Sequence, residues 1–317
     1  MKTLNELAEE YRQEFKDAKI SDLFNFPLWG EDKWDGEFVV VFISQDRIRI
    51  ANRHESIYEP TSLILPKLPK VDCVLLAEYI SLRGDLYCYL SDRSKPDCPT
   101  LALRVHSIVY LGNRDCRDLD YETRWNLLRQ LIPQDTEHVQ LVRHRKLIGQ
   151  GTAQIFYDEA REQGREGIVL KPCGSLREAG QKVKPKITLD VAVLGIKKSK
   201  KWKEKKIPNS FVLGTLENGI WKRFGESSSG LTDSERKGIG ETVLANKTGE
   251  DRHFIYCRPT IVLEIVCQEV KEGGYRHPRI IRIRDDKTVN KVTPREQVNQ
   301  LVKCILDDFF QKRNGNP

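Results

Sequence analysis

The apolar residues of this 317-residue chain come in short runs separated by turns, a pattern that favours sheets over helical bundles. The runs are rich in β-branched and aromatic residues, which is typical of strands. No run approaches the ~20 apolar residues that a membrane-spanning helix needs, so we expect a globular protein with no membrane partner. The predicted strands occupy residues 36–41, 47–51, 71–80, 86–90, 103–110, 167–170, 189–196, 210–216, 260–268 and 280–284.

Helical spacing of apolar residues is confined to a few segments. Helices are predicted at residues 4–19, 121–131, 152–164, 232–244 and 293–310. The tripeptide Lys184-Pro185-Lys186 indicates a boundary between a domain of residues 1–186 and a domain of residues 187–317. Several short strands around one internal helix fit a small β-barrel in the second domain. The predicted fold class is therefore α+β.

The positive charge of the chain is concentrated in one stretch. The whole chain has a formal net charge of +7, whereas residues 182–206 alone hold ten lysines against two acids, an excess of +8. The remainder of the chain is therefore close to neutral, and the lysine-rich stretch predicts a localised phosphate-binding face. A solvated lysine run is the alternative interpretation. No two of the eight cysteines have C-x-x-C spacing, so a zinc site is poorly supported.

The tetrapeptide Lys33-Trp34-Asp35-Gly36 stands just before a predicted strand. A lysine there is a candidate nucleophile if its ammonium loses a proton at neutral pH. Nearby cations or burial would lower its pKa and allow that loss. Many surface turns contain K-x-D-G, so the tetrapeptide alone does not decide the function.

Further charged residues follow at the ends of predicted strands. Glu78 follows an apolar run, and Glu166 begins the sequence E-G-I-V-L-K. Lys182 and Lys184 alternate, so both amines project from one face of an extended segment. An arginine-rich segment occupies residues 279–287. Taken singly, these are ordinary features: a strand-end acid, exposed lysines, or a cationic edge strand that opposes aggregation.

Taken together and in this order, the motifs resemble those of the ATP-dependent DNA ligase family of covalent nucleotidyltransferases. The resemblance extends from about residue 26 to residue 288 and includes the connecting segments 121–124, 230–233 and 262–265. It implies a nucleotidyltransferase domain, ATP-grasp-like with antiparallel sheets and helices, followed by an OB-fold β-barrel with a C-terminal helix.

The resemblance also implies roles for the residues around Lys33. Lys33 would attack the α-phosphate of ATP and hold AMP as a phosphoramidate, releasing pyrophosphate. Glu31 would contact the adenine, and Arg53 would lie near the ribose and the substrate end. Glu78 would bind on the ribose side and, with Glu166, would hold a divalent metal, Mg²⁺ or Mn²⁺. Hard cations prefer such oxygen ligands.

The resemblance further implies that cationic residues would bind the phosphates of ATP. Lys182 and Lys184 would grip the α-phosphate, and their field should lower the pKa of Lys33. Arg177 is a weaker candidate for an upstream arginine of the family. In the second domain, the family's R-x-D-K-type segment orients the leaving pyrophosphate, and Arg284, Asp286 and Lys287 match it here.

The lysine run at 197–206 would form a flexible basic loop that reaches the DNA backbone. Its candidate DNA-binding residues are Lys197, Lys198, Lys200 and Lys201. Trp202 within the run would either stack on a ligand or pack in the fold.

Three positions depart from the family pattern. Phe38 replaces an arginine, Leu76-Ala77 replaces an Asp-Gly pair, and His106-Ser107 aligns with a Phe-Asp pair whose aromatic ring stacks on adenine. His106 is either a weaker stacking residue or an ordinary strand histidine. None of these changes removes a group that the covalent chemistry requires.

The predicted function is therefore sealing of 5′-phosphate/3′-hydroxyl nicks in duplex DNA. Only 32 residues precede Lys33, which predicts a minimal ligase without a helical DNA-binding domain before it. The alternatives are an RNA ligase, a capping guanylyltransferase, and a non-catalytic nucleic-acid-binding relative. We expect a monomer, because no long apolar patch suggests an obligate dimer. We expect an intracellular location, because the first residues do not resemble a secretory signal.

Overall fold

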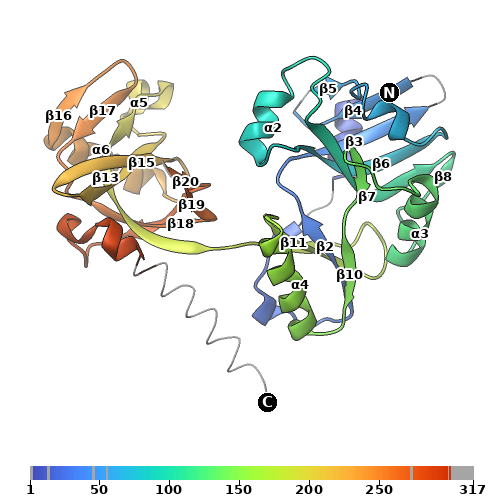
Figure 1. The fold of residues 1–317 in the computed structure, drawn as a ribbon. Helices are drawn as coiled ribbons and strands as arrows, with labels where there is room; N and C mark the ends of the chain where they lie inside the picture. The colour runs from blue at the N-terminus through green and yellow to red at the C-terminus, as the bar shows by residue number, and fades with distance from the viewer. Residues whose placement is uncertain are drawn as a thin grey trace. The chain divides into compact units, whose positions relative to one another are not determined.

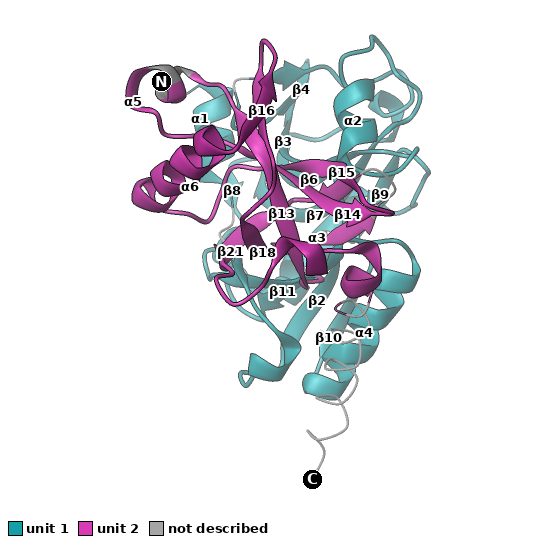
Figure 2. Ribbon diagram, turned by 90° about the vertical axis from the view of Figure 1, so that its left-hand side faces the viewer, with its two compact units in different colours: residues 1–184 teal, residues 185–317 magenta. Residues whose placement is uncertain are grey.

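The computed structural model describes residues 3–12, 15–44, 47–54, 56–271, 274–298 and 300, with the backbone alone at residues 200, 201, 203 and 271. The chain forms two units, Met1–Lys184 and Pro185–Pro317, which Figure 2 distinguishes by colour. Within the described ranges, no helix has both the length and the apolar character that crossing a membrane requires.

The large sheet of unit 1 is centred on three long antiparallel strands, β3 (Glu37–Ser44), β6 (Cys73–Ser81) and β7 (Leu101–Leu111). Both faces of this sheet are buried, because successive residues of β3 pack into separate clusters of apolar side chains. Helices α2 (Leu86–Asp92) and α3 (Tyr121–Leu131) cover one face, and α1 (Leu4–Glu10) covers the other. The remaining strands are β4 (Arg47–Ala51), β5 (Ile57–Tyr58), β8 (Arg114–Asp115) and β9 (Val139–Leu141), with a 3₁₀ turn at Leu65–Lys67.

The small sheet of unit 1 has five strands in the order β1-β12-β11-β2-β10. Its central pair is β11 (Gly167–Pro172) and β2 (Leu28–Lys33), which run antiparallel. Helix α4 (Gln150–Glu162) lies beside these strands in Figure 1 and buries Phe156 completely against them. The outer strands are β1 (Phe15–Asp17), β12 (Gly180–Val183) and β10 (His144–Leu147), with a 3₁₀ turn at Ile20–Asp22.

Two secondary-structure predictions for unit 1 are wrong. Residues 86–90 form part of helix α2 and not a strand, because the Asp85 carboxylate accepts hydrogen bonds from the N–H groups of Tyr87 and Cys88 and caps the helix. The helix predicted at 4–19 ends at Glu10, and the chain then forms β1, which pairs in parallel with β12.

Unit 2 is organised by its longest strand, β13 (Ile187–Lys197). This strand pairs with β14 (Phe211–Glu217), and on its other edge with β18 (Val262–Cys267) and then β17 (Phe254–Cys257). Helix α6 (Asp233–Ala245) packs against β13 and β17. The remaining strands are β15 (Ile220–Ser227), β16 (Lys247–Glu250), β21 (Arg279–Ile283) and the hairpin β19 (Glu269–Lys271) and β20 (Gly274–Arg276). Two sheet-rich units with a few helices confirm the predicted α+β class.

The basic stretch contains a helix where we expected a flexible loop. Helix α5 (Lys200–Lys205) begins after Ser199, whose hydroxyl accepts a hydrogen bond from the Trp202 N–H. Trp202 packs in the apolar core of unit 2 with 5% of its surface exposed. Of the C-terminal helix predicted at 293–310, residues 294–298 are helical, after a 3₁₀ turn at Val289–Lys291. The part beyond residue 300 lies outside the described residues.

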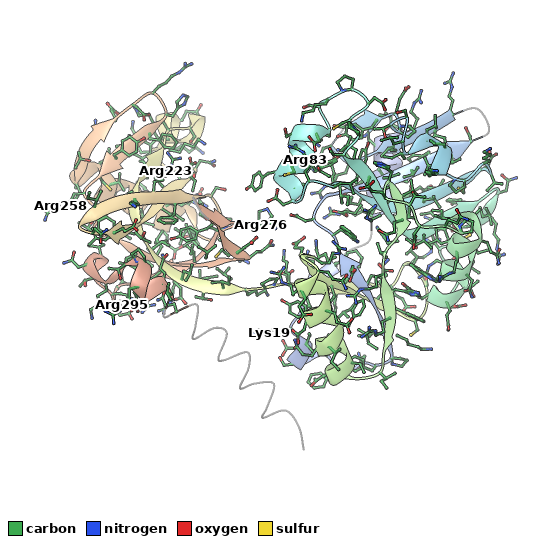
Figure 3. The ribbon with its side chains drawn as sticks, in the orientation of Figure 1. Lys19, Arg83, Arg223, Arg258, Arg276 and Arg295 are labelled. Carbon is green, nitrogen blue, oxygen red and sulfur yellow. The ribbon has the colours of Figure 1, made fainter. Side chains whose placement is uncertain are left out.

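A buried carboxylate fastens helix α2 to the large sheet. Asp92 is completely buried and accepts hydrogen bonds from Ser81, Thr100, Lys95 and Arg83. Figure 3 labels Arg83, whose Nε lies 2.8 Å from the carboxylate. The Arg83 hydrogen bonds, with those of Lys95, Thr100 and Ser81, hold the pKa of Asp92 far below its ordinary value. The ionised form is therefore the one that stabilises the fold.

We expect Asp92→Asn to lower the free energy of unfolding at pH 7 by about 1–3 kcal/mol, because the buried Ser81 hydroxyl and the half-exposed Arg83 and Lys95 lose a charged acceptor. The pKa of Asp92 is lower in the folded state than in the unfolded state. Its contribution is therefore complete above the unfolded value and is lost as the pH falls toward the folded value. Urea unfolding at pH 7 and at pH 3 should show a smaller difference between variant and wild type at pH 3.

The matched control is Asp118→Asn, which removes an exposed acid from a surface ion pair with Arg177. This variant should unfold like the wild type at both pH values. A loss of stability in Asp92→Asn that is as large at pH 3 as at pH 7 would contradict the role of the ionised carboxylate.

Candidate active site

Lys33 is the last residue of β2, in the middle of the small sheet. Its backbone carbonyl accepts a hydrogen bond of 2.9 Å from the Glu166 N–H, and Gly167 of β11 lies opposite it in the ladder. Because side chains alternate along a strand, Trp29, Glu31 and Lys33 project from the same face of β2. The position of the candidate nucleophile is thus fixed by strand pairing and not by a loop.

The Glu166 carboxylate lies between two lysines. One oxygen is 2.5 Å from Lys33 Nζ, and the other is 3.8 Å from Lys184 Nζ. The side chains of Lys33 and Glu166 are only 22% and 9% exposed. Lys182 lies two residues before Lys184, with its Nζ 3.8 Å from Asp17 of β1. The structure therefore brings three of the predicted site residues, Lys33, Glu166 and Lys184, into one cluster.

The electrostatic environment of Lys33 differs from the one we expected. Burial works to lower the pKa of Lys33, but the carboxylates of Glu166 and Glu78 outweigh it, and the pKa is raised. The expectation that neighbouring lysines depress this pKa is wrong for the protein without ligands, because acids are the nearest charges. Burial does lower the pKa of Lys184. In this state Lys33 is an ammonium paired with Glu166.

Glu78 is the second acid at this site. It lies on β6 opposite Phe38 of β3, and its carboxylate accepts a backbone hydrogen bond from Gly36. Burial raises the pKa of Glu78 to about 7, and the nearby Glu166 carboxylate adds to this effect while Lys33 opposes it. The site therefore holds two acids whose mutual repulsion is only partly compensated by lysine.

Two partly compensated carboxylates are suitable ligands for a hard divalent cation. Within the described residues, no group of three or more His, Cys, Asp or Glu side chains is arranged to hold a metal ion. Glu78 and Glu166 would therefore supply part of a coordination shell, and water and substrate oxygens would supply the rest.

Glu31 forms a buried ion pair on the same face of β2 as Lys33. One Glu31 oxygen is 2.8 Å from Lys171 Nζ, and the other accepts a hydrogen bond of 2.8 Å from the Tyr121 hydroxyl. Tyr121 also stacks on Trp29, with ring centroids 4.7 Å apart. Both carboxylate oxygens therefore have protein partners.

Lys171 and Tyr121 are site residues to which the sequence analysis gave no role. Lys171 ends the E-G-I-V-L-K sequence, and its side chain is 3% exposed. A lysine inside a buried strand requires a buried acid, so the apolar run before Lys171 was a partial signal that did not identify the partner. Tyr121 gave no such signal, because a tyrosine at the start of an amphipathic helix is ordinary.

Two predicted arginines have partners elsewhere in unit 1. Arg53 lies on the exposed turn after β4 and donates a hydrogen bond to His54. Arg177 is half exposed and pairs with Asp118 at 2.8 Å and with Asp115 at 3.4 Å.

The charged residues of the R-x-D-K-type segment gather around a buried acid of unit 2. The Asp190 carboxylate lies 3.0 Å from Arg284 Nη1 and 2.8 Å from Lys287 Nζ. Arg284 also donates two hydrogen bonds to Asp286. Asp190 is 1% exposed and was not predicted, because it lies in an apolar strand far from this segment in the sequence. It holds Arg284 and Lys287 side by side.

The candidate DNA-binding lysines are partly neutralised by acids. Lys197 Nζ lies 3.2 Å from Glu226, and Lys198 Nζ lies 2.8 Å from Glu250. The side chains of Lys200 and Lys201 lie outside the described residues.

Each unit contains a stretch that matches a known protein family. Residues 89–186 match the family described as ATP dependent DNA ligase domain, and residues 203–287 match the ATP dependent DNA ligase C terminal region. The first match contains Glu166, Lys182 and Lys184, and the second contains the Arg284–Lys287 segment. The chain belongs to the ATP-dependent DNA ligase family.

Curated relatives of this ligase-family chain are longer than the region they share with it. A DNA ligase of Methanosphaerula palustris is 28% identical over 235 residues, which cover 69% of this chain and 40% of the relative. A probable DNA ligase of Streptomyces griseus is 25% identical over 312 residues, which cover 86% of this chain and 59% of the relative. The chain thus spans about half the length of the curated relatives it matches.

The chain has the same fold as a solved Lig E DNA ligase structure, which comes from a study of DNA binding with a minimal scaffold. It matches with a TM-score of 0.63 and 16% identity, over 86% of this chain and 98% of that one. The ligase-family fold predicted from the sequence, a nucleotidyltransferase domain and an OB-fold domain, is confirmed by this similarity.

Gly36, the glycine of K-x-D-G, stands at a position where a larger residue would collide with its neighbours. A Cβ on Gly36 would lie 2.4 Å from the Tyr79 carbonyl oxygen and 3.1 Å from Glu78 Cγ. We expect Gly36→Ala to push β3 away from β6 beside Glu78 and to lower the free energy of unfolding by about 1–3 kcal/mol. Urea unfolding measures this loss, and self-labelling with ATP measures the effect on the site.

The matched control is Gly151→Ala in α4, where an added Cβ meets nothing within 4 Å. Alanine stabilises an open helical position, so this variant should be at least as stable as the wild type. A Gly36→Ala protein with wild-type stability would contradict the steric argument.

Proposed function

We propose that this protein is an ATP-dependent DNA ligase that seals nicks through a lysyl-AMP intermediate on Lys33. The observation that carries the proposal is the cluster of Lys33, Glu166 and Lys184, formed by the β2–β11–β12 pairing in a chain of the ligase family. A lysine fixed at a strand end beside acids and a second lysine suits transfer of a nucleotidyl group to nitrogen.

In the first step Lys33 Nζ attacks the α-phosphorus of ATP. A nitrogen–phosphorus bond forms, the bond from the α-phosphorus to the bridging oxygen breaks, and pyrophosphate leaves with the bonding electrons. Lys33 must lose one proton before the attack, for which the nearest acceptor is the Glu166 carboxylate, 2.5 Å from Nζ. The nitrogen loses a second proton to solvent once the nitrogen–phosphorus bond has formed. Lys184 and Lys182 would contact the non-bridging oxygens of the α-phosphate and neutralise their negative charge while Nζ attacks.

Glu78 and Glu166 are the residues that would hold Mg²⁺ or Mn²⁺. When bound, the cation would neutralise phosphate charge and oppose protonation of Lys33. In unit 2 we assign Arg284, Asp286 and Lys287 to the pyrophosphate leaving group. Their anchoring on Asp190 supports this assignment, because it preorganises two cations for one polyanionic ligand.

The later steps would transfer AMP to a 5′-phosphate and join the ends. The 5′-phosphate oxygen attacks the lysyl-AMP phosphorus and releases Lys33, and the 3′-hydroxyl then attacks the 5′-phosphate and releases AMP. Nicked duplex DNA is the proposed substrate, supported by the names of the relatives and by the basic stretch at the start of unit 2. Arg53, exposed after β4, is available for the substrate end.

Self-labelling with radioactive α-phosphate ATP and Mg²⁺ tests the first step. We expect an acid-labile AMP adduct on the wild type and none on Lys33→Ala, because alanine has no nucleophile. The matched control is Lys146→Ala, an exposed lysine on β10 of the same sheet, which should label like the wild type.

Three outcomes would contradict the proposal. The absence of an adduct on the wild type would exclude adenylation, and labelling by GTP in place of ATP would indicate a capping enzyme. Sealing of a nicked RNA duplex but not of a nicked DNA duplex would indicate an RNA ligase.

The basic stretch leads to a prediction for DNA binding. We expect alanine at Lys197, Lys198, Lys200 and Lys201 together to weaken binding to nicked duplex and to leave self-labelling unchanged. Because Glu226 and Glu250 already neutralise part of this charge, the slope of log affinity against log salt should become shallower by about 1–3. Fluorescence anisotropy across a salt series measures the slope. An unchanged slope, or equal loss of binding and self-labelling, would contradict the assignment.

A further inference from the structure

The hydrogen bonds of Lys171 define the state of a neighbouring histidine. A lysine ammonium has three N–H donors and no acceptor. Lys171 Nζ lies 2.8 Å from Glu31 Oε2, 3.2 Å from His106 Nδ1 and 3.3 Å from the His106 carbonyl oxygen. These three acceptors match the three donors, and the Lys171 side chain is only 3% exposed. Lys171 is therefore fully engaged by Glu31 and His106.

This arrangement selects one tautomer of His106. Since Lys171 can only donate, His106 Nδ1 must accept, and the ring proton must be on Nε2. Burial and the Lys171 charge both hold the pKa of His106 well below its ordinary value, so the ring is neutral. Nε2 has no hydrogen-bond partner among the residues that the structure describes. His106 therefore presents one fixed N–H donor and no available acceptor.

An irregularity in the large sheet places this donor at the candidate site. Leu76 pairs with Ser107 and the next residue, Ala77, pairs with Val105, so His106 is the extra residue of a β-bulge in β7. Bulges re-aim a side chain, and they are common beside active sites. The His106 ring lies 6.2 Å from the ring of Phe38.

Phe38 connects His106 to the nucleophile. Phe38 lies directly opposite Glu78 in the β3–β6 ladder, and cross-strand neighbours project from the same face of a sheet. Glu78 is close enough to Lys33 for each to shift the pKa of the other. The aromatic ring, the fixed donor, the acid and the lysine thus lie along one side of the site.

We propose that His106 determines the choice of nucleobase by donating its Nε2–H to N1 of adenine, with Phe38 forming an apolar wall beside the base. This inference rests on the proposed adenylation of Lys33. Adenine N1 is an acceptor, whereas guanine carries a hydrogen at N1, so guanine would oppose two donors and leave both unpaired. N3 and N7 are acceptors in both purines, and at position 6 a donor would favour the carbonyl of guanine, so N1 is the only ring position at which a fixed donor favours adenine. Lys171 is the positioning residue that holds the tautomer.

The test compares ATP with two analogues on the unaltered protein. In 1-deaza-ATP a C–H group replaces N1, and in 7-deaza-ATP a C–H group replaces N7. The second-order rate constant of adduct formation is measured by intact mass, which needs no labelled analogue. We expect a loss of about three- to tenfold with 1-deaza-ATP, the size expected for one neutral hydrogen bond, and no loss with 7-deaza-ATP.

His106→Phe should react with ATP and 1-deaza-ATP at equal rates, because the donor that distinguishes them is absent. The matched control His253→Phe changes an exposed histidine of unit 2 and should keep the wild-type ratio. Equal rates on the wild type, a loss with 7-deaza-ATP instead, or an unchanged ratio in His106→Phe would each overturn the inference. The wild-type comparison stands alone if His106→Phe does not fold. Absence of any adduct with ATP would instead overturn the proposed function.

Discussion

The ion pair between Lys33 and Glu166 is the interaction around which the candidate site is built. It forms because Lys33 ends β2 while Glu166 immediately precedes β11, and these strands pair antiparallel. The same carboxylate extends to Lys184 after β12. Without ligands, the charge balance at Lys33 is therefore set by the nearby acids, which keep the amine protonated. A polyphosphate with a divalent cation would change that balance in the direction that frees the amine.

Sequence reasoning was adequate where chemistry is tied to strand ends. Lys33, Glu166 and Lys184 were identified as charged residues at the ends of predicted strands, and the resemblance to the ligase family implied that they share one site. Sequence reasoning did not predict which buried residues pair with each other, because such pairs depend on the order of strands in the sheet. Lys171 meets Glu31 only because β11 lies beside β2 in the sheet, and nothing local to either residue specifies that neighbour.

The errors in secondary structure occur where the local sequence pattern does not decide between helix, strand and loop. A short apolar run satisfies both helical and strand periodicity, so local capping decides between them. Asp85 turns residues 86–90 into a helix, and Ser199 does the same for the basic run that we expected to be a loop. At the N-terminus the reverse occurs, because pairing with β12 draws Phe15–Asp17 into the small sheet.

Two of the expected departures from the family pattern affect residues proposed to contact the base, whereas the residues proposed to serve the phosphates are present. The phosphates of ATP carry negative charge that only cations neutralise, so in the proposed mechanism Lys184 and a metal ion held by Glu78 and Glu166 have few substitutes. The base is neutral and offers an edge and two faces, which different side chains can contact. By the resemblance to the family, Phe38 and His106 stand where an arginine and an aromatic residue are expected, and their rings lie 6.2 Å apart in the large sheet. In the proposed site, Phe38 on β3 would supply an aromatic ring and His106 on β7 a hydrogen-bond donor for the base.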